Sequence, residues 1–212
     1  MDAPARLDWG LARLGVALTG DIRDLLLEYV ALLARWNRAF NLTAVREPEA
    51  MVRRHILDSL TVVPHVQGDN LLDVGTGAGL PGMVVAAVRP RLAVTLLDAN
   101  GKKTRFCRQA AAELGLGNVT VVHRRVEDLR PPAGFDTVAS RAFRDQKRFL
   151  SACRGLVAPG GRLVAMAGRW TDEWQGTVHA VDVPGVPEAR HIVVVEPALA
   201  APGSEGGASG RV

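Results

Sequence analysis

Two stretches near the start of the chain place hydrophobic residues at helical spacing. In residues 21–40 these positions are Ile22, Leu25, Leu26, Tyr29, Leu33 and Trp36, a period typical of an amphipathic helix. Thr19 and the two residues after it can cap its start. A second stretch covers residues 48–63 and carries Met51, Val52, Ile56, Leu57 and Leu60 on one side. We therefore expect residues 1–66 to form a helical extension.

From residue 70 onward, short apolar runs alternate with helical patterns. Strands are predicted at residues 70–74, 93–98, 119–123, 135–140, 162–167 and 192–196, and helices at 81–88, 102–114 and 145–156. This alternation is typical of an α/β fold with a doubly wound, mostly parallel sheet, which we assign to residues 67–197. Residues 168–186 show no clear helical period, although 177–183 fit a strand. Residues 198–212 are rich in Gly, Ala, Ser and Pro, so we expect a disordered tail.

The most informative stretch is a glycine-rich turn between the first predicted strand and the helix after it. Glycines occupy positions 75, 77, 79 and 82, and Pro81 suits the first turn of a helix. Glycine reaches positive φ without strain and lets a ligand lie against bare backbone. The free N–H groups of the helix start would point at that ligand. A nucleotide-like ligand is therefore expected here.

The spacing of these glycines fits a dinucleotide fingerprint, but three details favour S-adenosylmethionine. Asp73 lies inside the end of the strand, two residues before the first glycine, where a carboxylate can bind an ammonium group directly or through water but would sit badly beside a pyrophosphate. Asp98 ends the next strand, where it can accept hydrogen bonds from ribose hydroxyls. The Pro-Gly-Gly turn at 159–161 lies between a helix and a strand, as in class I methyltransferases. An NAD-dependent oxidoreductase is disfavoured because the only tyrosine, Tyr29, lies in the N-terminal extension.

Composition narrows the picture only slightly. A chain of 212 residues that is 48% hydrophobic and 23% charged is ordinary for one globular domain. The net charge of +4 is weak support for a nucleic-acid partner. Cys107 and Cys153 lack the spacing of a zinc site or a disulfide framework, and no metal site is expected. The sequence shows no signal peptide and no apolar run of membrane-spanning length, so we expect a cytoplasmic monomer.

Several segments together resemble one family. They are residues 36–46, 54–60 and 73–82, then Leu97-Asp98, 102–106, 125–127, Ser140-Arg141-Ala142-Phe143 and 190–194. On these segments the chain resembles the ribosomal small-subunit methyltransferase G family, also called GidB-like, over about residues 10–197. The Asn-Leu-Thr, Arg-His-Ile-Leu-Asp-Ser and Ser-Arg-Ala-Phe segments belong to the family rather than to the wider fold.

The resemblance implies methylation of N7 of one guanine in the decoding-region loop of 16S rRNA, with S-adenosyl-L-methionine as the methyl donor. It implies cofactor contacts at Gly75, Leu80, Val126, Glu127 and Arg141, which join Asp73, Gly77 and Asp98 from the loop itself. Arg141 is the best candidate for a catalytic role, because it ends a strand at the mouth of the crevice.

The same resemblance exposes two departures. The family usually has Lys-Gly after the fifth strand, whereas this chain has Ala167-Gly168, and the segment from there to Arg190 is short. If the lysine contacts rRNA, affinity or activity could be reduced, and Arg169 could substitute. A fold that binds RNA and has lost catalysis therefore stays open as an alternative.

The candidate RNA-binding residues are Asn41, Arg53, His55, Lys102 and Arg144, within a wider set of basic residues formed by Arg54, Lys103, Arg105, Arg141, Lys147 and Arg148. The alternatives are a packed His55, a helix-end Asn41 and solvated helix faces for the charges. Asp58 is expected to pair with Arg54, four residues earlier.

Overall fold

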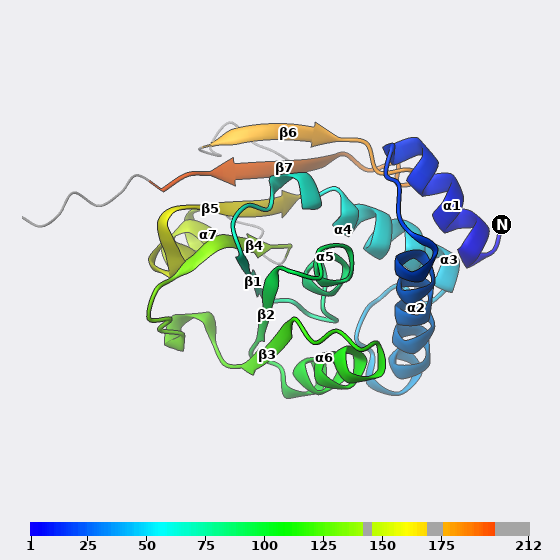
Figure 1. Ribbon diagram of the computed structural model, residues 1–212, viewed down its shortest axis with the longest axis horizontal. Helices are drawn as coiled ribbons and strands as arrows, with labels where there is room; N and C mark the ends of the chain where they lie inside the picture. The colour runs from blue at the N-terminus through cyan, green and yellow to red at the C-terminus, as the bar shows by residue number, and fades with distance from the viewer. Residues whose placement is uncertain (142–145, 169–175, 198–212) are drawn as a thin grey trace, which may run out of the picture.

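Seven strands form one sheet in the computed structural model, which describes residues 1–141, 146–168 and 176–197. The strand order is β3-β2-β1-β4-β5-β7-β6 (Figure 1). The strands are β1 (Asn70–Val74), β2 (Ala93–Asp98), β3 (Val119–His123), β4 (Phe135–Ser140), β5 (Val157–Ala167), β6 (Thr177–Val181) and β7 (Arg190–Val195). Strands β1 to β5 are parallel, and β7 runs antiparallel to both of its neighbours. The predicted α/β fold with a doubly wound, mostly parallel sheet is confirmed.

Both faces of the sheet are covered, because successive side chains of a strand point to opposite sides. Leu71 packs in a core with α5 (Gly82–Val88) and α6 (Gly101–Glu113), whereas Leu72 packs in a second core with α7 (Gln146–Cys153). Figure 1 shows α5 and α6 on one side of the sheet and α7 on the other. Register pairs Asp73 with Leu96 of β2 and Ala139 of β4. The carboxyl ends of three strands therefore meet at one edge.

The N-terminal helices extend the first of these cores. They are α1 (Ala3–Leu14), α2 (Gly20–Phe40), α3 (Pro48–Met51), a π-helical turn η1 (Val52–Leu57), α4 (Asp58–Leu60) and a 3-10 turn η2 (Val63–His65). Helix α2 packs on α5 and α6, the helices that cover this face of the sheet. At Gly10 of α1 an added Cβ would come within 2.2 Å of Leu57 Cδ1, so this glycine lets α1 approach η1 closely.

Several boundaries differ from the sequence pattern: β7 spans Arg190–Val195 rather than 192–196, and α7 ends at Cys153 rather than at 156. Four strands, β1 to β4, match their predicted ranges. The helix predicted at 48–63 ends at Leu60 and contains the π-helical turn, and α1 was not predicted as an element. Strand β5 starts at Val157 rather than at 162, because Val157 pairs with Phe135 across a shift in register. Strand β6 stops at Val181, two residues before its predicted end.

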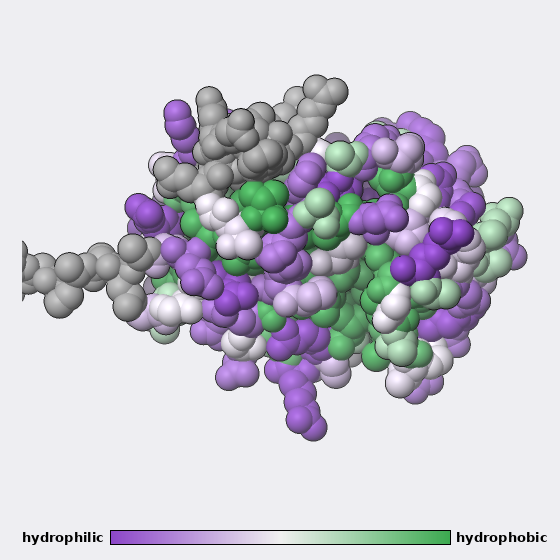
Figure 2. All heavy atoms as spheres, turned by 90° about the horizontal axis from the view of Figure 1, so that it is seen from above, coloured by the Kyte–Doolittle hydropathy of each residue, from purple (hydrophilic) through white to green (hydrophobic). Residues whose placement is uncertain are grey.

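The face seen from above Figure 1 carries many hydrophilic side chains (Figure 2). Figure 2 shows smaller groups of hydrophobic side chains between them on the face seen from above Figure 1. In the described ranges no helix combines the length and apolar character that a membrane span needs. The predicted disordered tail, Arg144 and Arg169 lie outside the described residues.

Candidate functional site

The glycine-rich turn forms a tight loop at the carboxyl edge of the sheet. Gly75, Gly77 and Gly79 have φ of 67°, 63° and 93°, a region that favours glycine. The N–H groups of Gly75 and Thr76 donate to the carbonyl of Leu97 at 2.8 and 3.0 Å. These two bonds tie the loop to the end of β2. The backbone at Gly75 and Gly77 therefore faces the crevice without a side chain in the way.

Asp73 connects the start and the end of this loop through hydrogen bonds. Its Oδ2 accepts from the Thr76 hydroxyl at 2.6 Å and from the Gly82 N–H at 2.8 Å. Burial raises the pKa of Asp73 to about 6, although both hydrogen bonds oppose that rise. Its Oδ1 is also buried and has no hydrogen-bond partner among the described residues. Sequence reasoning predicted a ligand contact here and missed the loop-closing role, which the spacing to Thr76 could have indicated.

Asp98 lies beside the loop at the end of β2 and is partly exposed. Its Oδ2 accepts from the Gly77 N–H at 2.9 Å, and its Oδ1 accepts from the Asn100 N–H at 2.8 Å. The N–H of Arg124 donates to the Asp98 carbonyl at 3.2 Å. That bond brings the segment after β3 next to β2. The short 3-10 turn η3 (Val126–Asp128) follows, and in it Val126 is half-buried and Glu127 is exposed.

The N-terminal extension braces the loop from the other side. The hydroxyl of the buried Tyr29 in α2 donates to the Ala78 carbonyl at 2.5 Å. Asn37, also in α2 and buried, accepts from the Thr43 N–H at 2.9 Å and donates to the Val45 carbonyl at 3.1 Å. These contacts hold residues 41–45 near the glycine loop. Sequence reasoning treated Tyr29 as a core residue only and did not single out Asn37.

Two cavities meet at Arg141. The loop cavity, about 200 Å³ in volume, is lined among others by Leu42, Thr43, Gly75, Gly77, Leu80 and Arg141. The arginine cavity, about 340 Å³, is lined among others by Arg54, His55, Asp58, Arg141, Ala167 and Arg190. Arg141 thus forms a wall of both. The predicted position of Leu80 and Arg141 at the crevice is consistent with this arrangement.

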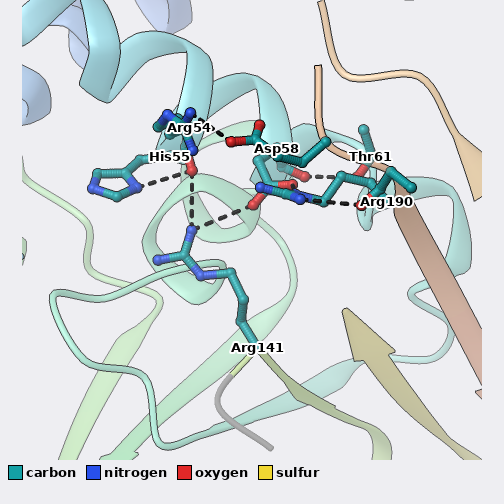
Figure 3. A network of polar contacts seen from close by, with 8 residues as sticks. Arg54, His55, Asp58, Thr61, Arg141 and Arg190 are labelled. Atoms are coloured by element: carbon teal, nitrogen blue, oxygen red, sulfur yellow. Dashed lines mark hydrogen bonds and ion pairs between the residues drawn. The ribbon is translucent and has the colours of Figure 1, made fainter. Parts of the chain in front are cut away.

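Arg141 and Arg190 hold a buried carboxylate between them (Figure 3). Arg141 Nη1 lies 3.4 Å from Asp58 Oδ2, and Arg190 Nε lies 3.4 Å from Asp58 Oδ1. Burial raises the pKa of Asp58, while both arginines act to lower it. The predicted pair of Asp58 with Arg54 is wrong, because Arg54 turns outward to Glu188 at 2.8 Å. The Arg54 carbonyl instead accepts from Arg141 Nη1 at 3.2 Å.

His55 is a buried brace in the structure. Its Nε2 lies 2.9 Å from the Thr43 hydroxyl and its Nδ1 lies 2.9 Å from the Arg54 carbonyl. Burial, with the nearby Arg141 charge, lowers the pKa of His55 to about 4, so the ring is neutral at pH 7. With both ring nitrogens occupied, the packed histidine is favoured over the RNA contact that the sequence analysis proposed.

The other candidate RNA-binding residues occupy separate places. Asn41 ends α2 with φ of 49° and an exposed side chain, as the helix-end alternative predicted. Lys102 is exposed in the first turn of α6. Arg53 donates to Glu49 at 2.9 Å and to the Gly185 carbonyl at 2.7 Å, which gives it partners within the chain. An RNA contact at Asn41, Arg53 or Lys102 stays a prediction.

The two cysteines show no sign of a nucleophilic site. Cys107 and Cys153 are both buried as free thiols, and burial raises the pKa of each. A buried thiol with a raised pKa is a poor nucleophile, in agreement with a passive role. Among the described residues, no three His, Cys, Asp or Glu side chains gather as metal ligands would.

Comparison with known proteins relates this site to one family. The sequence profile of rRNA small subunit methyltransferase G matches residues 22–194. A ribosomal RNA small subunit methyltransferase G from Alkalilimnicola ehrlichii is 47% identical over 205 residues, covering 92% of this chain and 93% of the relative. Another relative of that name, from Chromohalobacter salexigens, is 56% identical over 165 residues, covering 78% and 79%.

Solved structures agree with the fold. A SAM-dependent methyltransferase from Aquifex aeolicus superposes with a TM-score of 0.51 at 18% identity, covering 68% of this chain and 91% of that one. At this identity the likeness concerns the fold alone. The profile match covers the glycine loop, Asp58, Arg141 and Arg190 together. The chain therefore belongs to the rRNA small subunit methyltransferase G family.

Proposed function

We propose that the protein transfers the methyl group of S-adenosyl-L-methionine to N7 of one guanine in the decoding-region loop of 16S rRNA. The relatives that it matches are named ribosomal RNA small subunit methyltransferases. The observation that carries the proposal is the meeting of two cavities at Arg141, one against the glycine loop and one against Asp58 and Arg190. A methyl transfer needs a donor and an acceptor side by side, and this arrangement offers a site for each.

The residues of the loop fit S-adenosyl-L-methionine. Asp73 Oδ1 is a buried acceptor without a partner in the described part of the chain, and an ammonium group or a water bound to it would satisfy this oxygen. The bare backbone at Gly75 and Gly77 gives a ligand room for close approach. Asp98 has lone pairs left for ribose hydroxyls after accepting two backbone N–H groups. We assign the amino-acid end to Asp73, Gly75, Gly77 and Leu80 and the ribose to Asp98.

The adenine and the reacting end have their own candidates. Val126 offers a half-buried apolar wall and Glu127 an exposed segment beside β2, so we assign the adenine to them. Arg141 separates the two cavities and is our candidate for the residue nearest the reacting atoms. We assign the whole donor site to residues 67–197, with residues 1–66 as its brace.

Methyl transfer to guanine N7 needs no general acid or base from the protein. When bound, S-adenosyl-L-methionine supplies a methyl group on a positively charged sulfur. Guanine N7 has a free lone pair, so its attack needs no base; the transfer breaks one sulfur–carbon bond and forms one nitrogen–carbon bond. One positive charge passes to the guanine ring. The protein has to align the two groups and exclude water. The guanidinium of Arg141, which offers hydrogen-bond donors and no acceptor, suits orientation rather than proton transfer.

The test uses 30S subunits that lack the modification. They are incubated with the protein and S-adenosyl-L-methionine, and N7-methylguanine is mapped on the extracted 16S rRNA. We expect one new modified position. No methyl incorporation into 30S subunits or 16S rRNA would contradict the proposal. Thermal stabilisation by S-adenosylhomocysteine without incorporation would favour the RNA-binding module, and stabilisation by NADH alone would favour an oxidoreductase.

We also propose that the acting form is a monomer in the cytoplasm, because the proposed substrate is the ribosomal small subunit. Light scattering during size-exclusion chromatography tests the monomer, and cell fractionation tests the location.

A further inference from the structure

The arginine cavity holds more positive than negative charge. Arg141 follows β4, Arg190 starts β7 and Asp58 starts α4, so three separate elements bring these groups together. Their side chains are 28%, 23% and 7% exposed. Two guanidinium groups thus share one carboxylate at the wall of a cavity, and their combined charge is not neutralised by Asp58 alone.

Neither arginine is saturated by its protein partners. Both ion pairs to Asp58 measure 3.4 Å, which is longer than a strong charge-assisted hydrogen bond. Arg141 directs Nη1 at Asp58 and the Arg54 carbonyl, and Arg190 directs Nη1 at the Ala189 carbonyl. Each guanidinium has five N–H donors. The Nη2 groups of both residues have no acceptor among the described residues, so they can serve a ligand.

The other basic residue of the cavity is already engaged. Arg54 Nη2 lies 2.8 Å from Glu188 Oε1, and its side chain is 36% exposed. Arg190 instead lies over the end of β5. A Cβ placed on Gly168 would be 3.7 Å from Arg190 Nη1, and register pairs Ala167 with His191. Arg190 of β7 therefore lies beside the position at which the family usually has a lysine and this chain has Ala167.

We propose that the arginine cavity receives the acceptor nucleotide, that Arg190 binds an acceptor oxygen of that nucleotide, and that Asp58 is a positioning residue that holds Arg141 and Arg190 in place. This inference rests on the proposed function, because the methyl donor is assigned to the loop cavity on the other side of Arg141. The oxygen is either O6 of the guanine, beside the reacting N7, or a neighbouring phosphate. Both present a lone pair to a guanidinium, and they differ in charge.

Arg162→Gln is a matched control for Arg190→Gln. Arg162 lies on β5, is 25% exposed and pairs with Glu196 at 3.3 Å. Its burial and its ion-pair distance are close to those of Arg190, but its partner is exposed whereas Asp58 is buried. Arg162 lies near the other end of the strand pair, because Leu163 pairs with Val195 there. A loss that is general to removing a half-buried arginine would appear in both variants.

The experiment measures kcat and KM for unmodified 30S subunits, and separately the Kd for S-adenosylhomocysteine by calorimetry. We expect Arg190→Gln to raise KM by ~10- to 100-fold, with the S-adenosylhomocysteine Kd within about twofold of wild type and with partial rescue by Arg190→Lys. Asp58→Asn should also raise KM, as Arg190→Gln does. Arg162→Gln should behave as wild type. A flatter dependence of log KM on log salt concentration in Arg190→Gln identifies the phosphate, and an unchanged slope identifies O6.

Two results would overturn the inference. Wild-type kcat/KM in Arg190→Gln would remove Arg190 from acceptor binding, and a parallel rise in the S-adenosylhomocysteine Kd would assign the cavity to the donor. If the wild-type protein transfers no methyl group, the proposed function fails; the affinity of the S-adenosylhomocysteine-bound protein for 16S rRNA then tests the cavity by itself. Weaker binding by Arg190→Gln but not by Arg162→Gln supports it, and equal binding by all three proteins refutes it.

Discussion

The bond between Tyr29 and Ala78 connects the N-terminal extension to the glycine loop, and Tyr29→Phe removes it with the loss of one oxygen atom. The hydroxyl donates to the Ala78 carbonyl at 2.5 Å, and the tyrosine side chain is 1% exposed. No other described donor reaches that carbonyl. The variant therefore leaves a buried acceptor without a partner, while the ring keeps its packing against Phe106.

The expected cost follows from that unpaired carbonyl. A buried polar group left without its hydrogen bond costs about 1–3 kcal/mol. For a domain of this size, each kcal/mol lowers Tm by about 2–4 °C, so we expect Tm to fall by about 2–12 °C. If the bond also orders the loop for its ligand, about 1 kcal/mol of that cost reappears in binding. The Kd for S-adenosylhomocysteine then rises about fivefold.

Calorimetric melting and ligand titration measure the two quantities. Thr137→Val is the control, because the buried Thr137 hydroxyl donates to the Gln67 carbonyl at 2.9 Å in β4, before the carboxyl end of that strand. It should lose stability and bind S-adenosylhomocysteine as wild type does. Unchanged Tm and Kd in Tyr29→Phe would refute the reasoning. A lower Tm with unchanged Kd would limit the bond to a structural role.

Three further predictions concern the loop and its surroundings. Gly82→Ala brings a Cβ within 2.2 Å of Leu96 Cδ2, so it should cost about 1–3 kcal/mol in urea unfolding; Gly155→Ala, with nothing within 4 Å, should cost little, and equal stabilities would contradict the packing argument. Asp98→Asn removes a charge that accepts two backbone N–H groups, so the Kd for S-adenosylhomocysteine should rise ~10- to 100-fold; a wild-type Kd would exclude Asp98 from the ribose site. Burial lowers the pKa of His55 from 6.5 to about 4, so as pH falls the unfolded chain takes up this proton first and stability is lost, by about 1 kcal/mol between pH 7.5 and 5.5. His55→Asn should flatten that part of the pH–stability curve, and an unchanged slope would contradict a buried, neutral histidine.

The sequence by itself determined the sheet and the position of the loop. The strands β1 to β4 match their predicted residues. Each is a short run rich in apolar and β-branched residues, a signal contained within the segment. The same holds for the glycine loop and for Asp73 and Asp98 at the two strand ends, since parallel neighbours bring their carboxyl ends to one edge. The family, too, was evident from short segments.

The structure differs from the sequence-based prediction at elements whose conformation depends on neighbouring elements. The turn at Gly160-Gly161 reads as a break in the sequence, yet β5 continues through it, because Val157 pairs with Phe135 across a register shift. The helical pattern of residues 48–63 gives no sign of the π-helical turn at Val52–Leu57, which packs against α1. Periodicity reports which face is apolar and does not record what that face will meet.

Tertiary structure alone decided the partners within the site. Local spacing favoured Arg54 as the partner of Asp58, but packing brought Arg141 from 83 positions away and Arg190 from the start of β7. Tyr29 reaches the glycine loop across 49 positions. Such pairs depend on how whole helices and strands pack together. The hydrophobic pattern of a segment does not specify which distant segment it will contact. The residues of the glycine loop could therefore be predicted from the sequence, whereas the arginine cavity forms only where β4, β7 and the N-terminal helices come together.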